Sequence, residues 1–354
     1  RFEKDLATKL NIKFAVNANS ATSALCMALG ALNINPGDEV ICTCLSFTAT
    51  ATSIVASNAI PIFVDIDPKN YCMDINSIEK KITKKTKALM LVHALGNCAE
   101  MDKLTRICKK NKLILVEDAC EALGSRFKNK QLGTFGEFSS FSFYYSHHIT
   151  SGEGGMVCVK NKKYLDVIKS LRSHGWSRDL SNNKFISKKY KNIDKNWIFI
   201  NSGFNLRPTD INAAIGIQQL KRLKKILSIR KYNFLKIKKK LINNKNYKNQ
   251  FSILSDQKYS NIAWFGIPLV LNSKNKKYKL KVMNKLNQKG IMTRPIISGN
   301  FANQPSIQLY KIKSKTKLPN ADLIDKNSFF LGLHNIKITD NKLRILTDHI
   351  YSSL

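Results

Sequence analysis

The sequence lacks any apolar run long enough to cross a membrane. A transmembrane helix needs about 20 consecutive apolar residues, and every apolar stretch of this chain is broken by charged or polar residues well before that length. We find no secretory leader, so we expect a cytoplasmic protein without a membrane partner. Residue 1 is arginine and residues 1–7 already have a helical pattern, so we also expect a leading segment before them in the whole protein.

Acidic residues are scarce, with 24 against 59 basic residues and a formal net charge of +35. Such an excess would ordinarily suggest a nucleic acid as partner. Only ten of the basic residues are arginine, however, and the lysines are spread along the whole chain among many asparagines. No nucleic-acid motif or basic groove with spaced aromatic residues accompanies them. We therefore predict no nucleic-acid partner, although the positive field would attract a polyanionic substrate such as a nucleotide sugar.

Cysteine is missing from the second half of the chain. The eight cysteines lie in the first half and mostly within apolar runs, at positions 26, 42, 44, 72, 98, 108, 120 and 158. Buried free thiols in a reducing compartment explain this pattern better than a disulfide framework. We predict no metal site.

Short apolar strands alternate with helical segments through the first 243 residues, which indicates a large domain with a mainly parallel sheet. The length of 354 residues exceeds the roughly 100 to 200 residues of one domain, and we predict a second, smaller α/β domain over 244–354. The expected strands are 13–16, 40–44, 62–65, 88–92, 113–118, 138–143, 156–159, 264–271 and 290–294. The expected helices are 1–7, 24–32, 47–57, 101–110, 164–173, 211–220 and 280–289, and residues 184–195 are expected to form an irregular surface loop.

The stretch from Phe138 to Gly155 is the most informative part of the chain. An apolar run leads into a cluster of hydroxyl side chains with His147 and His148, and a glycine-rich turn and a second apolar strand follow. Polar side chains at the end of a buried strand are where α/β proteins place their chemistry. This pattern predicts a catalytic or cofactor loop.

That loop resembles the lysine loop of the DegT/DnrJ/EryC1/StrS family of sugar-nucleotide aminotransferases. The match is carried by Ser142-Phe143 at one end and Glu153-Gly154-Gly155 at the other. In the family the loop lysine binds pyridoxal phosphate covalently, and here that position falls on His147. An imidazole cannot do this, but it can move protons near neutral pH. The exchange is typical of a 3-dehydratase branch that uses pyridoxamine phosphate, and in this reading His147 is the catalytic acid/base.

The resemblance covers nearly the whole chain and implies an α/β fold of type I, as in aspartate aminotransferase, active as a homodimer with pyridoxal or pyridoxamine phosphate. Ser20 is a predicted N-cap, and a helix that starts there would offer free amides to a phosphate. For the cofactor the resemblance implies a phosphate site at the helix start, an aromatic platform, a carboxylate on the ring nitrogen and a phosphate contact from the neighbouring subunit. These and the remaining expected cofactor contacts are Ala21, Thr22, Phe47, Asp118, Glu121, Ser142 and Asn205.

For the substrate the resemblance implies a GDP-4-keto-6-deoxyhexose, with glutamate as the amino donor. The matching segments are 173–178 and 294–301, together with the Gly203-Phe-Asn-Leu-Arg stretch. The expected substrate contacts are His174, Arg207 and Arg294, although Arg207 could instead tie its own loop.

Three other functions are open at this stage. A related 3-dehydratase uses a 2Fe-2S cluster and a reductase, but such a cluster needs four thiolates, and no cysteine follows Cys158; we therefore expect neither cluster nor reductase. The chain could be an ordinary aminotransferase that uses another lysine. It could also be a non-catalytic binding member of the fold, against which Asp118, Ser142 and Glu153 argue.

Overall fold

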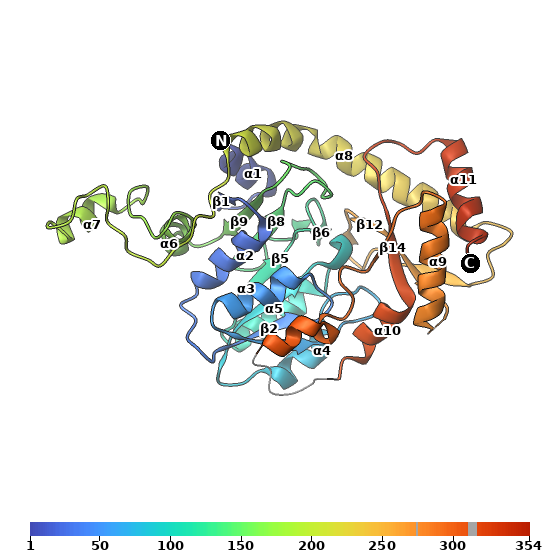
Figure 1. Ribbon diagram of the computed structural model, residues 1–354, viewed down its shortest axis with the longest axis horizontal. Coiled ribbons are helices and arrows are strands. Elements are labelled where there is room, and N and C mark those ends of the chain that lie inside the picture. Colours follow the sequence, from blue (N-terminus) through green and yellow to red (C-terminus); the bar gives the residue numbers. More distant parts are fainter. Residues whose placement is uncertain (274, 311–316) are drawn as a thin grey trace.

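The computed structural model describes residues 1–273, 275–310 and 317–354 (Figure 1). Its centre is a seven-stranded sheet in the order β1-β9-β8-β5-β4-β2-β3. The strands are β1 (Phe14–Ala18), β2 (Glu39–Thr43), β3 (Ile60–Val64), β4 (Thr86–Val92), β5 (Ile114–Asp118), β8 (Phe138–Ser142) and β9 (Gly155–Val159).

Five neighbouring strands, from β3 to β8, pair in parallel, and β9 is antiparallel to both β8 and β1. The strands are buried along almost their whole length, since every residue of β8 and β9 is buried. A parallel sheet needs helices on its two faces, and its strands therefore read as continuous apolar runs. The predicted α/β fold with a large, mainly parallel sheet is confirmed.

Helices follow most strands of this sheet. They are α1 (Phe2–Leu10), α2 (Ala21–Gly30), α3 (Thr48–Ala56), α4 (Ile75–Ile78), α5 (Met101–Lys110) and α6 (Lys162–Arg172), with short 3-10 turns at Glu79–Lys81 and Ala94–Gly96. A three-stranded sheet of β7 (Lys130–Gln131), β6 (Arg126–Phe127) and β11 (Ser260–Asn261) lies beside it. These elements agree with the expected helices and strands to within a few residues.

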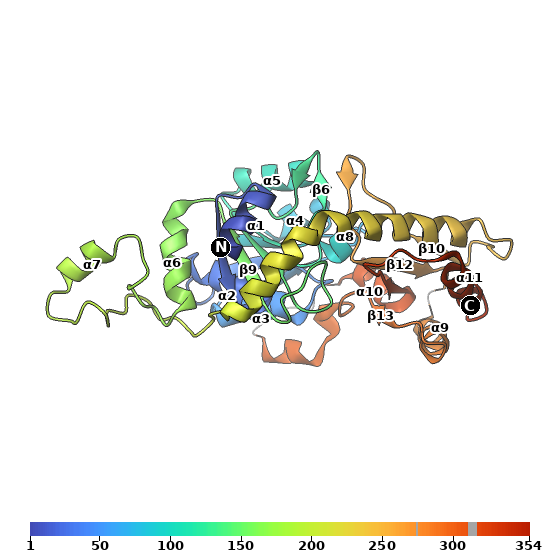
Figure 2. The same cartoon turned by 90° about the horizontal axis from the view of Figure 1, so that it is seen from above.

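The expected surface loop over 184–195 is partly wrong. Residues Asn183–Lys189 form a helix, α7, because Ile186 packs with Leu180 and Ile198 in a small apolar cluster separate from the main core. We refer to residues 174–204 as the arm, since Figures 1 and 2 both show α7 and its flanking segments projecting away from the body at one end of the molecule.

The helix expected at 211–220 is far longer than predicted. It begins after the N-cap Thr209 and runs from Asp210 to Ile242 as α8. In both views it passes along the large sheet and continues to the second one (Figures 1 and 2). Buried positions recur at helical spacing beyond the expected end, for example Leu223, Ile226 and Ile237, and these contacts extend the helix.

The second sheet is antiparallel and has the order β10-β12-β14-β13. Its strands are β10 (Phe251–Ile253), β12 (Gly266–Leu271), β13 (Thr293–Pro295) and β14 (Ser328–Gly332), with helices α9 (Lys276–Gln288), α10 (Pro319–Asn327) and α11 (Asp340–Tyr351) and 3-10 turns at Phe301–Asn303 and Pro305–Leu309. Buried residues of the two sheets belong to one continuous core. The division into domains at residues 243 and 244 therefore stays a prediction.

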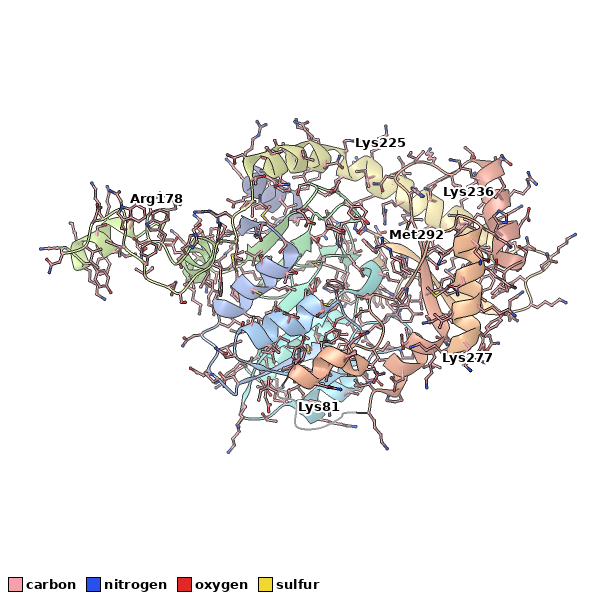
Figure 3. All side chains as sticks on the ribbon, viewed as in Figure 1. Lys81, Arg178, Lys225, Lys236, Lys277 and Met292 are labelled. Carbon is pink, nitrogen blue, oxygen red and sulfur yellow. The ribbon has the colours of Figure 1, made fainter. Side chains whose placement is uncertain are left out.

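Most of the positive charge lies on the surface. Labelled side chains such as Lys225 and Lys277 point away from the body (Figure 3). Within the described part of the chain, no helix is both long and apolar enough to cross a membrane. Over the same residues, no group of three or more His, Cys, Asp or Glu side chains could hold a metal ion.

Candidate active site

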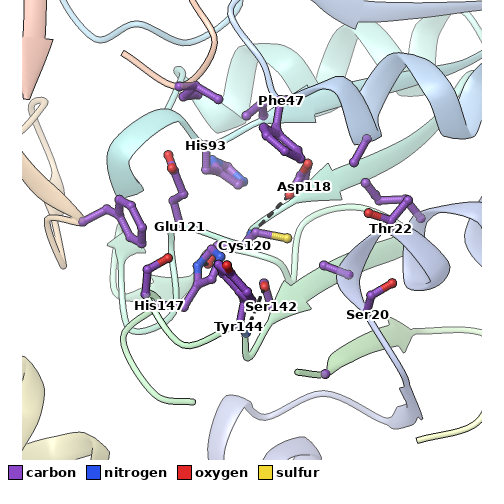
Figure 4. Close-up of a pocket in the computed structure, with 18 of the residues that line it drawn as sticks. Ser20, Thr22, Phe47, His93, Asp118, Cys120, Glu121, Ser142, Tyr144 and His147 are labelled. Carbon is purple, nitrogen blue, oxygen red and sulfur yellow. Dashed lines mark hydrogen bonds between the residues drawn. The ribbon is translucent and has the colours of Figure 1, made fainter. Parts of the chain in front are cut away.

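The central sheet opens into a cavity of about 460 Å³ at the carboxyl ends of its parallel strands (Figure 4). This is the edge of an α/β sheet where ligands usually bind. Side chains reach it from the ends of β4, β5 and β8, from the starts of α2 and α3, and from the second sheet. Of the predicted site residues, the structure brings together at this cavity Ala21, Thr22, Phe47, Asp118, Glu121, Ser142, His147 and Arg294.

A buried hydrogen-bonded pair, His93 and Glu117, fixes the end of β5. The carboxylate of Glu117 accepts hydrogen bonds from Nε2 of His93 at 2.9 Å and from the backbone amides of Gly133, Phe135 and Gly136 at 2.6 to 2.8 Å. Burial by itself raises the pKa of Glu117, but His93 and these amides lower it below its usual value. The carboxylate therefore stays ionised, and it holds the next residue, Asp118, at the cavity.

Asp118 is buried and has only long internal hydrogen bonds. Its oxygens accept from Thr50 Oγ1 at 3.3 Å, from the amide of Cys120 at 3.3 Å and from Ser140 Oγ at 3.4 Å. These donors orient the carboxylate without satisfying it fully. It is free to accept a short, charge-assisted hydrogen bond from a ligand.

Glu121 lies three residues after Asp118, in the turn that follows β5. Its Oε2 accepts from the backbone amide of Leu95 at 2.7 Å. Burial raises the pKa of Glu121 to about 7, the Leu95 amide works against this shift, and the negative charge of Asp118 adds to it. The carboxyl group is thus partly protonated at neutral pH and can donate a hydrogen bond.

His147 is held as a neutral base. Its Nδ1 lies 2.9 Å from the carbonyl oxygen of Cys120, and because a carbonyl only accepts, Nδ1 carries the hydrogen. Nε2 keeps its lone pair. Burial lowers the pKa of His147 to about 4; the Cys120 carbonyl opposes this shift and the positive charge of Arg230 reinforces it.

The neighbouring His148 points elsewhere. It is buried, its Nε2 donates to the carbonyl of Ala263 at 2.8 Å, and it does not line the cavity. Of the two adjacent histidines, His147 is therefore the one available to a ligand.

The start of α2 forms one wall of the cavity. Ser20 caps this helix, its Oγ accepting from the amide of Ser23 at 3.1 Å, and the first helical residues, Ala21 and Thr22, border the cavity. The strand β9 passes so close that a Cβ on Gly155 would lie 2.3 Å from the carbonyl of Ser20. Free amides at a helix start, approached by a glycine backbone, suit a phosphate group.

Phe47 lies at the cavity with 60% of its surface exposed. It immediately precedes α3. A large aromatic side chain left open at a cavity offers its face to a planar ligand.

Three predicted residues do not line this cavity. His174, Asn205 and Arg207 are exposed in the segment between α6 and α8, where Ser173 and Asn205 form an isolated bridge. Their proposed roles stay predictions, and that of Asn205 was assigned to the cofactor of a neighbouring subunit.

Several lining residues were not predicted as site residues. They are His93, Cys120, Tyr144, Ser146, Phe265, Ile297 and Phe330, together with apolar and backbone contributors. His93 follows a buried strand directly, as predicted site residues do, so this signal could have found it. Phe265 and Phe330 come from the second sheet, and no local pattern marks them.

The cavity fits pyridoxal or pyridoxamine phosphate by its chemistry. Asp118 would hold a protonated ring nitrogen, Phe47 a ring face and the start of α2 the phosphate. His93 borders the cavity, and its buried Nδ1 has no partner among the described residues. None of the described residues that line the cavity is a lysine, so they would hold the cofactor without a covalent bond.

The chain is similar to known proteins over nearly its whole length. Residues 1–348 match the DegT/DnrJ/EryC1/StrS aminotransferase family. The GDP-4-keto-6-deoxy-D-mannose 3-dehydratase of Yersinia pseudotuberculosis is 32% identical over 349 residues, covering 96% of this chain and 87% of that protein. The GDP-perosamine synthase of Escherichia coli O157:H7 is 34% identical over 296 residues, covering 84% and 75%.

A solved structure is similar over almost the full length. It is a crystal structure of GDP-4-keto-6-deoxymannose-3-dehydratase with a trapped PLP-glutamate geminal diamine. The TM-score is 0.88 at 29% identity, and the alignment covers 99% of this chain and 91% of that one. The similarity includes both sheets.

Proposed function

Because the chain belongs to the DegT/DnrJ/EryC1/StrS aminotransferase family of pyridoxal-phosphate-dependent enzymes, we propose that it is a sugar-nucleotide 3-dehydratase. Its substrate is a GDP-4-keto-6-deoxyhexose, most simply the mannose epimer named in its relatives. Glutamate supplies the amino group that converts pyridoxal phosphate to pyridoxamine phosphate. The products are the corresponding 3-deoxy ketone and ammonia, with 2-oxoglutarate formed from the donor and the 3-hydroxyl lost as water.

The observation that carries this proposal is the state of His147. By the resemblance of its loop it corresponds to the family's lysine; it also borders the cavity, and its hydrogen bond to Cys120 leaves Nε2 as the basic atom. A lysine at this place would favour amino transfer, because its amine can displace the substrate. An imidazole can move a proton without forming a lasting bond to the cofactor.

When bound, the cofactor supplies an electron sink next to the carbon that loses its hydroxyl. Asp118 would hold the ring nitrogen in its protonated form, which would maintain that sink. Glu121, with its pKa raised to about 7 by burial, would donate a hydrogen bond to the cofactor. Phe47 would lie against the ring and limit access of water to it.

His147 accepts a proton at Nε2 while Nδ1 stays bonded to the Cys120 carbonyl. The ring therefore keeps its orientation as its charge changes, and the carbonyl stabilises the imidazolium that forms. Arg294, which borders the cavity from β13, is suited to an anionic group of the substrate such as a phosphate or the glutamate carboxylate.

Product analysis tests the proposal. The protein is incubated with GDP-4-keto-6-deoxymannose, pyridoxal phosphate and glutamate, and the nucleotide sugars are identified by mass spectrometry. We expect the 3-deoxy ketone, its loss in His147→Asn and its retention in His349→Asn on α11. An amino sugar as the only product would assign the chain to the aminotransferase activity that its GDP-perosamine synthase relatives suggest.

The proposal includes a homodimer. The arm exposes large apolar side chains, among them Phe185, Trp197, Phe199 and Phe204, each more than half exposed. Apolar surface of this kind usually marks an interface. A second subunit that covers the arm would bring Asn205, Arg207 and His174 toward a cavity, where they could contact cofactor and substrate.

A further inference from the structure

Arg230 is a buried cation on the inner face of α8. Only 4% of its surface is exposed. Its Nη2 donates to the carbonyls of Trp264 at 3.1 Å and Phe265 at 2.7 Å, and its Nη1 donates to the carbonyl of Leu333 and to Oδ1 of Asn335. The guanidinium thus joins α8 to the segments that flank β12 and β14.

All four acceptors are uncharged. Over the described residues, no carboxylate lies within 4.0 Å of the guanidinium. A buried charge is normally paired, because removing it from water is costly. Burial lowers the pKa of Arg230 to about 10, so the group is still cationic at neutral pH, and its charge acts on its surroundings without a local counter-ion.

The segment held by Arg230 is the one that packs on His147. The ring of Phe265 lies 5.2 Å from the ring of His147 and 5.9 Å from that of His148. On the other side of this segment, the Ala263 carbonyl accepts from Nε2 of His148. Residues 263–265 are therefore fixed between Arg230 and the histidine loop, and Phe265 covers the imidazole.

Two buried nitrogens in this layer have no partner among the described residues, Nε of Arg230 and Nδ1 of His148. The first is a donor. The second is an acceptor, because Nε2 of His148 carries the hydrogen given to Ala263. The Ala263 carbonyl thus fixes the hydrogen of His148 on Nε2, and the cation of Arg230 on this side disfavours a second proton on either histidine.

Other ionisable groups also face His147 across the cavity. They are His93 after β4, Asp118, Cys120 and Glu121 after β5, Tyr144 and Glu153 of its own loop, and Arg294 on β13, while His148, which does not border the cavity, follows His147 in the chain. In addition to burial, the charge of Arg230 lowers the pKa of His147, and it also lowers the pKa of His148.

We propose that Arg230 is a positioning residue for the reaction: its hydrogen bonds hold Phe265 against His147, and its unpaired charge adds to the effect of burial in disfavouring a second proton on that imidazole. This inference rests on the role of His147 proposed above. It assigns to α8, a helix outside the cavity, control over the base inside it.

Two variants separate the charge from the hydrogen bonds. Arg230→Gln keeps amide donors but removes the charge, whereas Arg230→Lys keeps the charge but loses the planar fork. Lys239→Met removes a charge from an exposed position of the same helix and serves as the control. For each protein, the pKa of His147 is measured by NMR in cofactor-free protein labelled at histidine. The signal that is missing in His147→Asn is assigned to His147. The pH profile of kcat/KM is recorded as well.

In Arg230→Gln we expect the pKa of His147 and the acid limb of the profile to rise together, by about one unit. In Arg230→Lys both should stay near the wild-type values while kcat falls, because Phe265 is held less firmly. Lys239→Met should change neither quantity.

An unchanged pKa of His147 in Arg230→Gln would overturn the inference, whether or not the enzyme is a dehydratase, since the titration needs no substrate. If the pKa of His147 rises but the protein makes no 3-deoxy ketone, the inferred role of Arg230 stands and the proposed reaction is refuted. If Arg230→Gln does not fold, Arg230→Lys still tests the charge: because that variant keeps the charge, a clear shift of its acid limb would overturn the role of the charge.

Discussion

Nε2 of His93 lies 2.9 Å from Oε2 of Glu117, and both side chains are completely buried. The pair joins the end of β4 to the end of β5, one residue before Asp118. A hydrogen-bonded carboxylate at this depth has no water to replace a lost donor, so Glu117 and His93 depend on each other.

We therefore predict that Glu117→Gln lowers the free energy of unfolding by about 3 to 5 kcal/mol. The amide would turn an NH2 group toward backbone amides that need an acceptor. Chemical denaturation measures the loss. The control is Glu79→Gln, which breaks the exposed pair with Lys110 at 2.9 Å and should cost no more than about 1 kcal/mol. Equal losses in the two variants would contradict a special role for the buried pair.

The raised pKa of Glu121 predicts a pH dependence of stability. The pKa is about 7 in the folded protein and about 4.3 in an unfolded chain. The folded state thus binds this proton more tightly than the unfolded chain does. The contribution of this proton to the free energy of unfolding is therefore fully present below about pH 4.3 and is lost as the pH rises through about 7.

Glu121→Gln cannot ionise, and in cofactor-free protein it should be more stable than the wild type at pH 8, by about 1 to 3 kcal/mol. The gain should shrink toward pH 5. Denaturation curves at both pH values give the difference, and the exposed Glu100→Gln should show no such trend. A gain of equal size at both pH values would show that Glu121 titrates normally.

His147→Lys tests whether the residue at position 147 decides between deoxygenation and amino transfer. The wild type should retain no cofactor on the peptide after borohydride, whereas the lysine variant should retain it covalently at residue 147, as mass spectrometry of peptides would detect. Formation of 3-deoxy ketone should fall by about 100-fold to 10,000-fold, and amino sugar should appear. His147→Asn, the control, should give neither adduct nor deoxygenation. Full activity without an adduct in His147→Lys would mean that another residue is the base.

Gly155 should be sterically required at the proposed phosphate site. A Cβ there would lie 2.3 Å from the backbone carbon and oxygen of Ser20, so Gly155→Ala must displace the start of α2. We expect weaker binding of pyridoxal phosphate, measured by fluorescence titration, and a lower melting temperature. Gly332→Ala, where a Cβ would meet nothing within 4 Å, should change neither. Unchanged affinity in Gly155→Ala would place the phosphate elsewhere.

The arm should mediate dimer formation. Replacing Trp197 and Phe204 by serine removes two side chains that are 58% and 69% exposed, so the monomer should keep its stability while the dimer is weakened. Light scattering after size-exclusion chromatography measures the mass. Ile336→Ser, at an equally exposed position outside the arm, should leave the mass unchanged. A dimer that survives both arm substitutions would place the interface on another surface.

The sequence by itself determined the features that depend on neighbours along the chain. Strand and helix periods indicated the mainly parallel sheet, and Ser20 was recognised as an N-cap from its place before an apolar run, as the structure has it. The loop around His147 could be read because its distinctive residues lie within a short stretch. Asp118 was predicted from the resemblance, and the structure places its carboxylate at the end of β5.

Only the tertiary structure decided the chemical state of these groups. The tautomer of His147 depends on the carbonyl of Cys120, the pKa of Glu121 depends on burial, and Arg230 acts from a helix distant in sequence. The length of α8 and the helix α7 also follow from contacts with distant residues, such as Ile198 for Ile186. Burial and hydrogen bonding between distant segments arise only when the chain packs, and a local pattern carries no record of them.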